Sequence, residues 1–214
     1  SDHVSSMGIS VFSYCTNLTI VPALPATELV TDCYSSMFQG CVNLTTPPKL
    51  PATDLAASCY SSMFNGCKRL TYAPELPATE LAPSCYRGMF MNCTSLTATP
   101  ELPASILYDK CYYEMFRGCA KLDTVIMLAT SISASYCLDS WLRGVASTGT
   151  FTKSTKMESL PTGINGIPEG WIVVNRDTPD EPEGVPYITF SADSEQTMTV
   201  ISNGDYVLKS SLQY

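Results

Sequence analysis

Residues 41–66 read CVNLTTPPKLPATDLAASCYSSMFNG, and this pattern occurs in five successive copies spaced by 26 residues, with the fifth copy the most divergent. The copies begin at Cys15, Cys41, Cys67, Cys93 and Cys119. A fixed period of this length is typical of solenoids, whose turns stack because no single turn can bury its own apolar face. The sequence therefore predicts an α/β repeat solenoid, a right-handed coil of short parallel strands and short helices.

The first half of each copy predicts a strand. In the quoted copy Leu44 and Leu50 are six positions apart, and an even spacing places both side chains on one face of an extended segment. Pro48 lies between them and has no backbone N–H to donate. We therefore expect the hydrogen-bonded part of each strand to be only two or three residues long.

The second half of each copy predicts a helix. A Thr or Ser precedes an apolar run, as expected of a helix N-cap, at Thr27, Thr53, Thr79 and Ser105. Leu55, Cys59, Met63 and Phe64 follow at roughly helical spacing. Each helix is expected to end at a Gly or Asn in the left-handed conformation, at Gly40, Gly66, Asn92, Gly118 and Gly144.

The pattern divides the chain into four parts. Residues 1–145 form the repeat array, with a partial first turn at 7–14 and full repeats from residue 15. Residues 146–174 are predicted to cap the array with the apolar run 171–174 as a covering strand. Residues 175–184 form an acidic Pro/Gly linker, and residues 185–214 form a small β segment, interpreted as the start of a truncated domain or, alternatively, as a piece that docks on the cap.

Charge and hydropathy exclude several classes of function. The net charge is −8 and no basic stripe runs along the repeats, so we expect no nucleic-acid partner. No apolar run approaches the ~20 residues of a transmembrane helix, and no export signal opens the sequence. The repeats contain no nucleophile with a nearby base and no metal-ligand spacing, so we expect no enzyme activity, no cofactor and no metal. We also expect a monomer.

The ten cysteines fall in two columns of the repeat. Two interpretations remain open: disulfides, favoured by the even number, and buried free thiols packed as small apolar residues, favoured because Met7 and Val145 occupy the ends of the columns. We prefer structural ladders of buried thiols. Their members are Cys15, Cys41, Cys67, Cys93 and Cys119 in one column and Cys33, Cys59, Cys85, Cys111 and Cys137 in the other.

The repeat L-P-A-T-x-L-x-x-x-C-Y-x-x-M-F-x-G-C-x-x-L-T-x-x-P, as it stands at residues 24–48, resembles the BspA-like leucine-rich repeats of bacterial surface proteins. The resemblance extends over about residues 7–174. It implies a leucine-rich-repeat solenoid in a secreted or surface-anchored protein of a host-associated bacterium. It also implies protein binding, adhesion and no catalysis.

Positions that vary between near-identical repeats are free of the packing constraint, and on the strand side they predict a surface for a protein or glycan partner. The predicted partner-binding residues are Lys49, Tyr72, Glu75 and Glu101. Neutral variation is the alternative for these positions. A second aromatic column, Tyr34, Tyr60, Tyr86 and Tyr112, is interpreted as covering the core rather than as a sugar platform. The alternative function is a structural spacer that displays another domain away from the cell.

Overall fold

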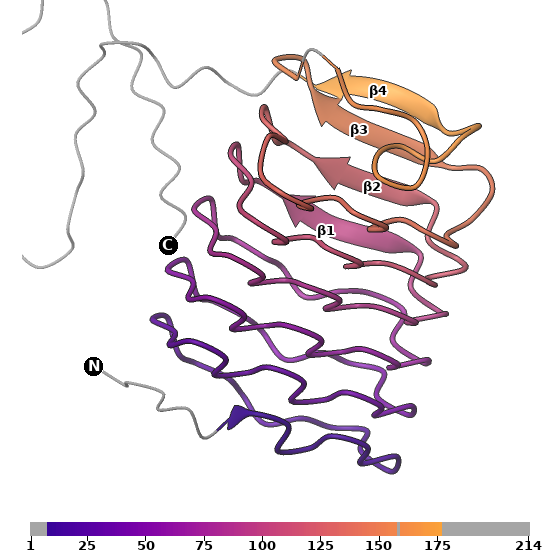
Figure 1. The fold of residues 1–214 in the computed structure, drawn as a ribbon. Helices are drawn as coiled ribbons and strands as arrows, with labels where there is room; N and C mark the ends of the chain where they lie inside the picture. The colour runs from indigo at the N-terminus through magenta and orange to yellow at the C-terminus, as the bar shows by residue number, and fades with distance from the viewer. Residues whose placement is uncertain (1–7, 158, 177–214) are drawn as a thin grey trace, which may run out of the picture. The chain divides into compact units, whose positions relative to one another are not determined.

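The computed structural model describes residues 8–157 and 159–176. They belong to the first of two compact units, Ser1–Pro179. Figure 1 shows this unit as a stack of similar turns, with four strands at its C-terminal end. The predicted β segment 185–214, most of the linker 175–184 and Met7 lie outside the described residues.

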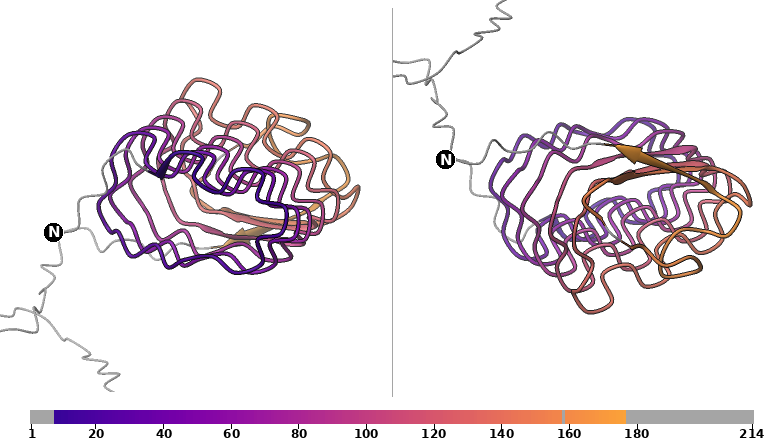
Figure 2. Two further views of the ribbon diagram at one scale, coloured as in Figure 1. Left: turned by 90° about the horizontal axis from the view of Figure 1, so that it is seen from below. Right: turned by 90° about the horizontal axis from the view of Figure 1, so that it is seen from above.

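The four strands form one parallel sheet in the order β1-β2-β3-β4. Their bounds are Ala98–Leu102 for β1, Thr124–Met127 for β2, Thr150–Ser154 for β3 and Ile172–Arg176 for β4. Thr124 pairs with Thr150, so neighbouring turns are in register at the 26-residue period. Seen along the stack, the strands lie above one another on one side of the coil (Figure 2). We call this the strand side.

Regular strands are missing from the first three repeats. Residues 18–24, 44–50 and 70–76 occupy the corresponding positions but form no strand or ladder in the described structure. Proline explains this, because each segment contains at least one residue without an N–H. Even β1 is irregular at Pro100: the pairing shifts between Ala98 and Glu101, and the Ile126 N–H donates to Thr99 Oγ1 instead of to a carbonyl.

The prediction of helices is wrong. No α-helix occurs in the described residues, and the segments 30–40, 56–66, 82–92, 108–118 and 134–144 are successive tight turns. Backbone N–H groups alternate between two acceptors. The Phe38 N–H donates to the Met63 carbonyl of the next turn at 2.9 Å, whereas the Ser35 N–H donates within its own turn to the Asp32 carbonyl at 3.0 Å. We call this side of the coil the turn side.

A left-handed residue at every fourth position prevents helix formation here. In the first full turn these residues are Asp32, Ser36 and Gly40, with φ of 59°, 55° and 71°. The expected left-handed backbone at the Gly/Asn column is confirmed, including Asn92 with φ of 60°, although no helix ends there. A spiral with a four-residue repeat buries nearly the same positions as a helix with 3.6 residues per turn, which is why the apolar pattern was misleading.

Two aromatic ladders run through the core. The rings of Phe12, Phe38, Phe64, Phe90 and Phe116 stack with centroid distances of 5.5 to 5.7 Å. The second ladder, Tyr34, Tyr60, Tyr86 and Tyr112, continues onto Trp141. The apolar interior is therefore continuous from turn to turn, as expected of a solenoid.

The C-terminal turns cover the end of this core. Trp141 is fully buried, packs edge-on against Phe151, and donates its indole N–H to the Gly166 carbonyl at 2.9 Å. Trp171 likewise donates to the Ala146 carbonyl at 2.9 Å. Each indole buries a large apolar surface while its polar group stays satisfied. The predicted covering strand is present as β4, which pairs with β3.

Candidate binding surface on the strand side

The cysteines form part of the core. None of the ten, all of which lie in the described part of the chain, is in a disulfide, and nine are buried. Cys15 is exposed, so the expectation of burial is wrong for this member. Four thiols also donate to a phenylalanine carbonyl 29 residues earlier, with Sγ to O distances of 3.0 to 3.2 Å; they belong to Cys41, Cys67, Cys93 and Cys119.

Burial makes these thiols chemically inert. Loss of solvation raises the pKa of Cys59 and of Cys67 to about 12, and it raises that of Cys93 well above its usual value. Because the thiolate is the reactive form, neutral buried thiols have little nucleophilic or metal-binding capacity near neutral pH. The described residues contain no group of three or more His, Cys, Asp and Glu side chains placed to hold a metal ion.

The tyrosine column is also part of the core. Tyr34, Tyr60, Tyr86 and Tyr112 are at most 4% exposed. A sugar ring stacks on an accessible aromatic face, and these faces are covered by the neighbouring turns. The interpretation of this column as core rather than as a sugar platform is confirmed.

A groove on the strand side brings together three of the four predicted partner-binding residues. Lys49 and Glu75 are exposed, and Tyr72 is 51% exposed. The groove has a volume of about 580 Å³ between the second and third full repeats. We call it the strand-side groove; its lining is Thr46, Pro47, Pro48, Lys49, Leu50, Pro51, Tyr72, Ala73, Pro74, Glu75 and Pro77.

Proline gives the groove its character. Five of its eleven lining residues are prolines, and three of them, Pro47, Pro48 and Pro74, belong to the segments that lack a hydrogen-bonded ladder. Proline has a fixed φ and no N–H, so it provides a stiff apolar wall. Two exposed charged residues, Lys49 and Glu75, also line the groove, and they occupy the same repeat column one turn apart. Neither forms an ion pair with a described residue.

Glu101 differs from the other three predicted residues. It lies on β1 in the column of Lys49 and Glu75 and lines a neighbouring pocket of about 470 Å³ that also includes Glu75. Its carboxylate is already paired with the Arg176 guanidinium at 2.8 Å. The structure therefore groups Lys49, Tyr72 and Glu75 in one groove and places Glu101 beside it with an internal partner.

Sequence reasoning missed a second surface cluster, on the turn side. Arg87, Lys110, Tyr113, Tyr136 and Asp139 line a pocket of about 300 Å³. The signal was available in the sequence, since these positions hold only Ser or Asp in the earlier repeats.

These features define a class of protein: a stacked repeat solenoid with a sulfur-lined core and open grooves. The family model described as BspA type Leucine rich repeat region (6 copies) matches residues 1–123 and 49–154, which together exceed half of the chain. The chain belongs to the BspA-type leucine-rich repeat family, and the resemblance seen in the sequence is confirmed. This family is typical of bacterial surface-associated and binding proteins.

Comparison with curated proteins and with solved structures gives no match. In the described ranges, we find no helix with the length and apolar character needed to cross a membrane.

Proposed function

We propose that this protein is a non-catalytic binding module that acts outside the cell or at the cell surface, where its solenoid recognises a protein partner in adhesion to host or neighbouring cells. The observation that supports this most directly is the strand-side groove. It combines a half-exposed tyrosine, a lysine and a glutamate over a stiff wall of prolines. Family membership favours the same role.

The groove suits a protein partner for two physical reasons. Binding hot spots are enriched in aromatic and long basic side chains, and Tyr72 and Lys49 supply both within one hollow. A rigid wall also loses little conformational entropy when a partner docks, so less of the interaction free energy is spent on ordering. Lys49 and Glu75 would set the orientation of the partner through charge complementarity.

The test measures binding of the whole chain to a panel of immobilised extracellular-matrix proteins by surface plasmon resonance. Tyr72→Ala combined with Lys49→Ala should weaken the strongest interaction by tenfold or more, since hot-spot truncations cost at least ~1.4 kcal/mol. The matched control is Lys68→Ala combined with Tyr108→Ala, which removes the same two side-chain types at exposed positions outside the groove.

Two outcomes would contradict the proposal. If both double variants bind like the parent chain, the groove is not the contact surface. If the parent chain binds no panel protein, the alternative role of a structural spacer is favoured. Equal melting temperatures of all three chains are required, so that weaker binding reflects the surface and not the fold.

A further inference from the structure

The turn side carries a cluster that differs from the rest of its repeat columns. The residue after each Cys-Tyr step is Ser35 and Ser61 in the early repeats, and the residue before each cysteine is Asp32, Ser58 and Ser84. Only the later repeats replace these residues, four times with a large side chain and once, at Asp139, with an acidic one. The replacements are Arg87, Tyr113 and Asp139 in the first column and Lys110 and Tyr136 in the second.

Three successive tight turns bring the five side chains together: Arg87 comes from the first, Lys110 and Tyr113 from the second, and Tyr136 and Asp139 from the third. The Tyr113 N–H donates to the Lys110 carbonyl at 3.2 Å, and in the next repeat the Asp139 N–H donates to the Tyr136 carbonyl at 3.3 Å. The Lys110 ammonium lies 5.8 Å from the centroid of the Tyr136 ring, and the Arg87 guanidinium carbon lies 5.3 Å from that of Tyr113. Each cation therefore rests over an aromatic ring, which limits its motion.

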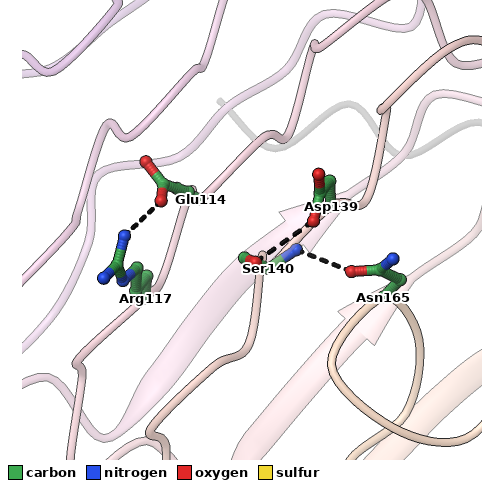
Figure 3. A network of polar contacts seen from close by, with 5 residues as sticks. All are labelled: Glu114, Arg117, Asp139, Ser140 and Asn165. Atoms are coloured by element: carbon green, nitrogen blue, oxygen red, sulfur yellow. Dashed lines mark hydrogen bonds and ion pairs between the residues drawn. The ribbon is translucent and has the colours of Figure 1, made fainter.

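These cations have no carboxylate partner in the described structure. Arg87 and Lys110 make no ion pair with a described residue, whereas nearby Arg117 is paired with Glu114 (Figure 3). Both cations are exposed, so their donors face solvent. Held in place and uncompensated, they form a pre-positioned site for an anionic group.

Asp139 adds acceptors to the same pocket. Ser140 Oγ donates to Asp139 Oδ1 at 3.1 Å, and the Ser140 N–H donates to Asn165 Oδ1 at 3.0 Å, so the residue that donates to this carboxylate is itself held by the adjoining loop (Figure 3). One carboxylate accepts up to about four hydrogen bonds, so most of its capacity remains for hydroxyl groups.

The backbone at this place is unfavourable for large side chains. Lys110 and Tyr136 have φ of 55° and 56°, in the left-handed region where earlier repeats have Asp or Ser. A bulky residue is disfavoured there, and such strain recurs at binding sites. The fold requires this conformation, and the earlier repeats meet the requirement with Asp or Ser, so the backbone alone does not require large side chains at these two positions.

We propose that this turn-side pocket binds an acidic saccharide, a sugar that carries a carboxylate or sulfate group. The cations would bind the anionic group, Asp139 would accept from ring hydroxyls, and the tyrosine rings would border the apolar face of the sugar. The volume of about 300 Å³ lies at the small end of ligand sites and suits one sugar residue. An acidic peptide such as polyglutamate fits less well, because its side chains carry carboxylates but no hydroxyl groups from which Asp139 could accept.

The experiment titrates the whole chain with four probes by calorimetry at low salt. A hyaluronan tetrasaccharide carries only carboxylates, 6-sulfated N-acetyllactosamine carries only sulfate, lactose is neutral, and hexaglutamate is an acidic peptide. We expect binding of at least one of the two acidic sugars, at least tenfold weaker binding of lactose, and no stronger binding of hexaglutamate. Comparison of the first two probes shows whether the pocket prefers a sugar with a carboxylate or a sugar with a sulfate.

Variants locate the site. Arg87→Ala combined with Lys110→Ala should weaken binding of the acidic sugar by tenfold or more. Asp139→Ala should weaken this binding several-fold, although the substitution removes a negative charge. The matched control, Lys68→Ala combined with Arg69→Ala, removes the same two charges from exposed positions elsewhere. An equal loss in the control, a preference for hexaglutamate, or no sugar binding by the parent chain would each overturn the proposal. None of these outcomes bears on the strand-side groove, whose residues are unchanged in these variants.

Discussion

Arg176 and Glu101 join the last strand of the sheet to its first. The Arg176 Nη2 atom lies 2.8 Å from Glu101 Oε1, although β2 and β3 separate β1 from β4. The hydrogen bond that the Arg176 guanidinium donates to Glu101 is the main cause that raises the pKa of Arg176. The two side chains are 41% and 47% exposed, so water screens the pair.

Arg176→Gln should therefore have a small effect on stability. Exposed ion pairs contribute about 0.2 to 1 kcal/mol, and salt weakens them. We expect urea denaturation to show a loss in this range at 20 mM NaCl and a smaller loss at 1 M NaCl. If the free energy of unfolding fell by several kcal/mol, the pair would instead be an important contact that holds the end of the array in place.

The burial of nine cysteines predicts a simple labelling pattern. Iodoacetamide at pH 8 should modify Cys15 alone in the native protein, because the other thiols are inaccessible and neutral. In non-reducing denaturant all ten should react. Mass spectrometry measures both numbers; fewer than ten additions after denaturation would show that disulfides exist in the protein.

The raised thiol pKa values predict alkaline unfolding. A group whose pKa is raised on folding contributes its full stability below its unfolded value, ordinarily about 9, and loses it as the pH approaches the folded value. Cys59, Cys67, Cys111 and Cys119 have folded pKa values of about 12. The free energy of unfolding should fall by up to about 1.4 kcal/mol per pH unit for each such thiol between pH 9 and 12.

Urea denaturation at pH 8, 9, 10 and 11 measures this slope. Cys59→Ala combined with Cys67→Ala should flatten it, because this change removes two of the thiols whose pKa is raised. A slope unaffected by the double substitution would exclude thiol ionisation as the cause.

The glycine column predicts a coupled pair of substitutions. Gly66→Ala places a side chain at φ 78° without close contacts and should cost about 1 to 2 kcal/mol. Gly118→Ala should cost more, because its new Cβ would lie 2.5 Å from Asn92 Oδ1.

Adding Asn92→Gly should remove the extra cost of Gly118→Ala and leave Gly66→Ala unchanged. Thermal denaturation of the single and double variants completes a double-mutant cycle for each pair. Equal coupling in the two cycles would refute the contact between Asn92 and residue 118.

Sequence periodicity was enough to predict the solenoid, its turn boundaries and its buried columns, because stacking requires the same residue type at the same place in every turn. It failed for the turn side. Cys59, Met63 and Phe64 satisfy a helix and a four-residue spiral alike, and the choice depends on hydrogen bonds between repeats, such as Phe38 N–H to Met63, that a single copy does not contain.

The candidate site was predicted in part. Variation between repeats singled out Lys49, Tyr72 and Glu75, and the structure groups them in one groove. It did not reveal the Arg176 partner of Glu101, because that contact joins segments 75 residues apart in turns that no longer follow the repeat. The turn-side pocket was missed because the position of a side chain in a tight turn follows from backbone conformation and not from periodicity.

The tyrosine ladder also has an optical consequence. Tyr86 lies 6.1 Å from Tyr112, and Tyr112 lies 6.4 Å from Trp141, centroid to centroid. Light absorbed by any of these phenols can pass from ring to ring and emerge as indole fluorescence from one end of the stack. Separation of two neighbouring turns would interrupt this energy transfer, so the intensity of tryptophan fluorescence on tyrosine excitation reports whether the turns remain stacked.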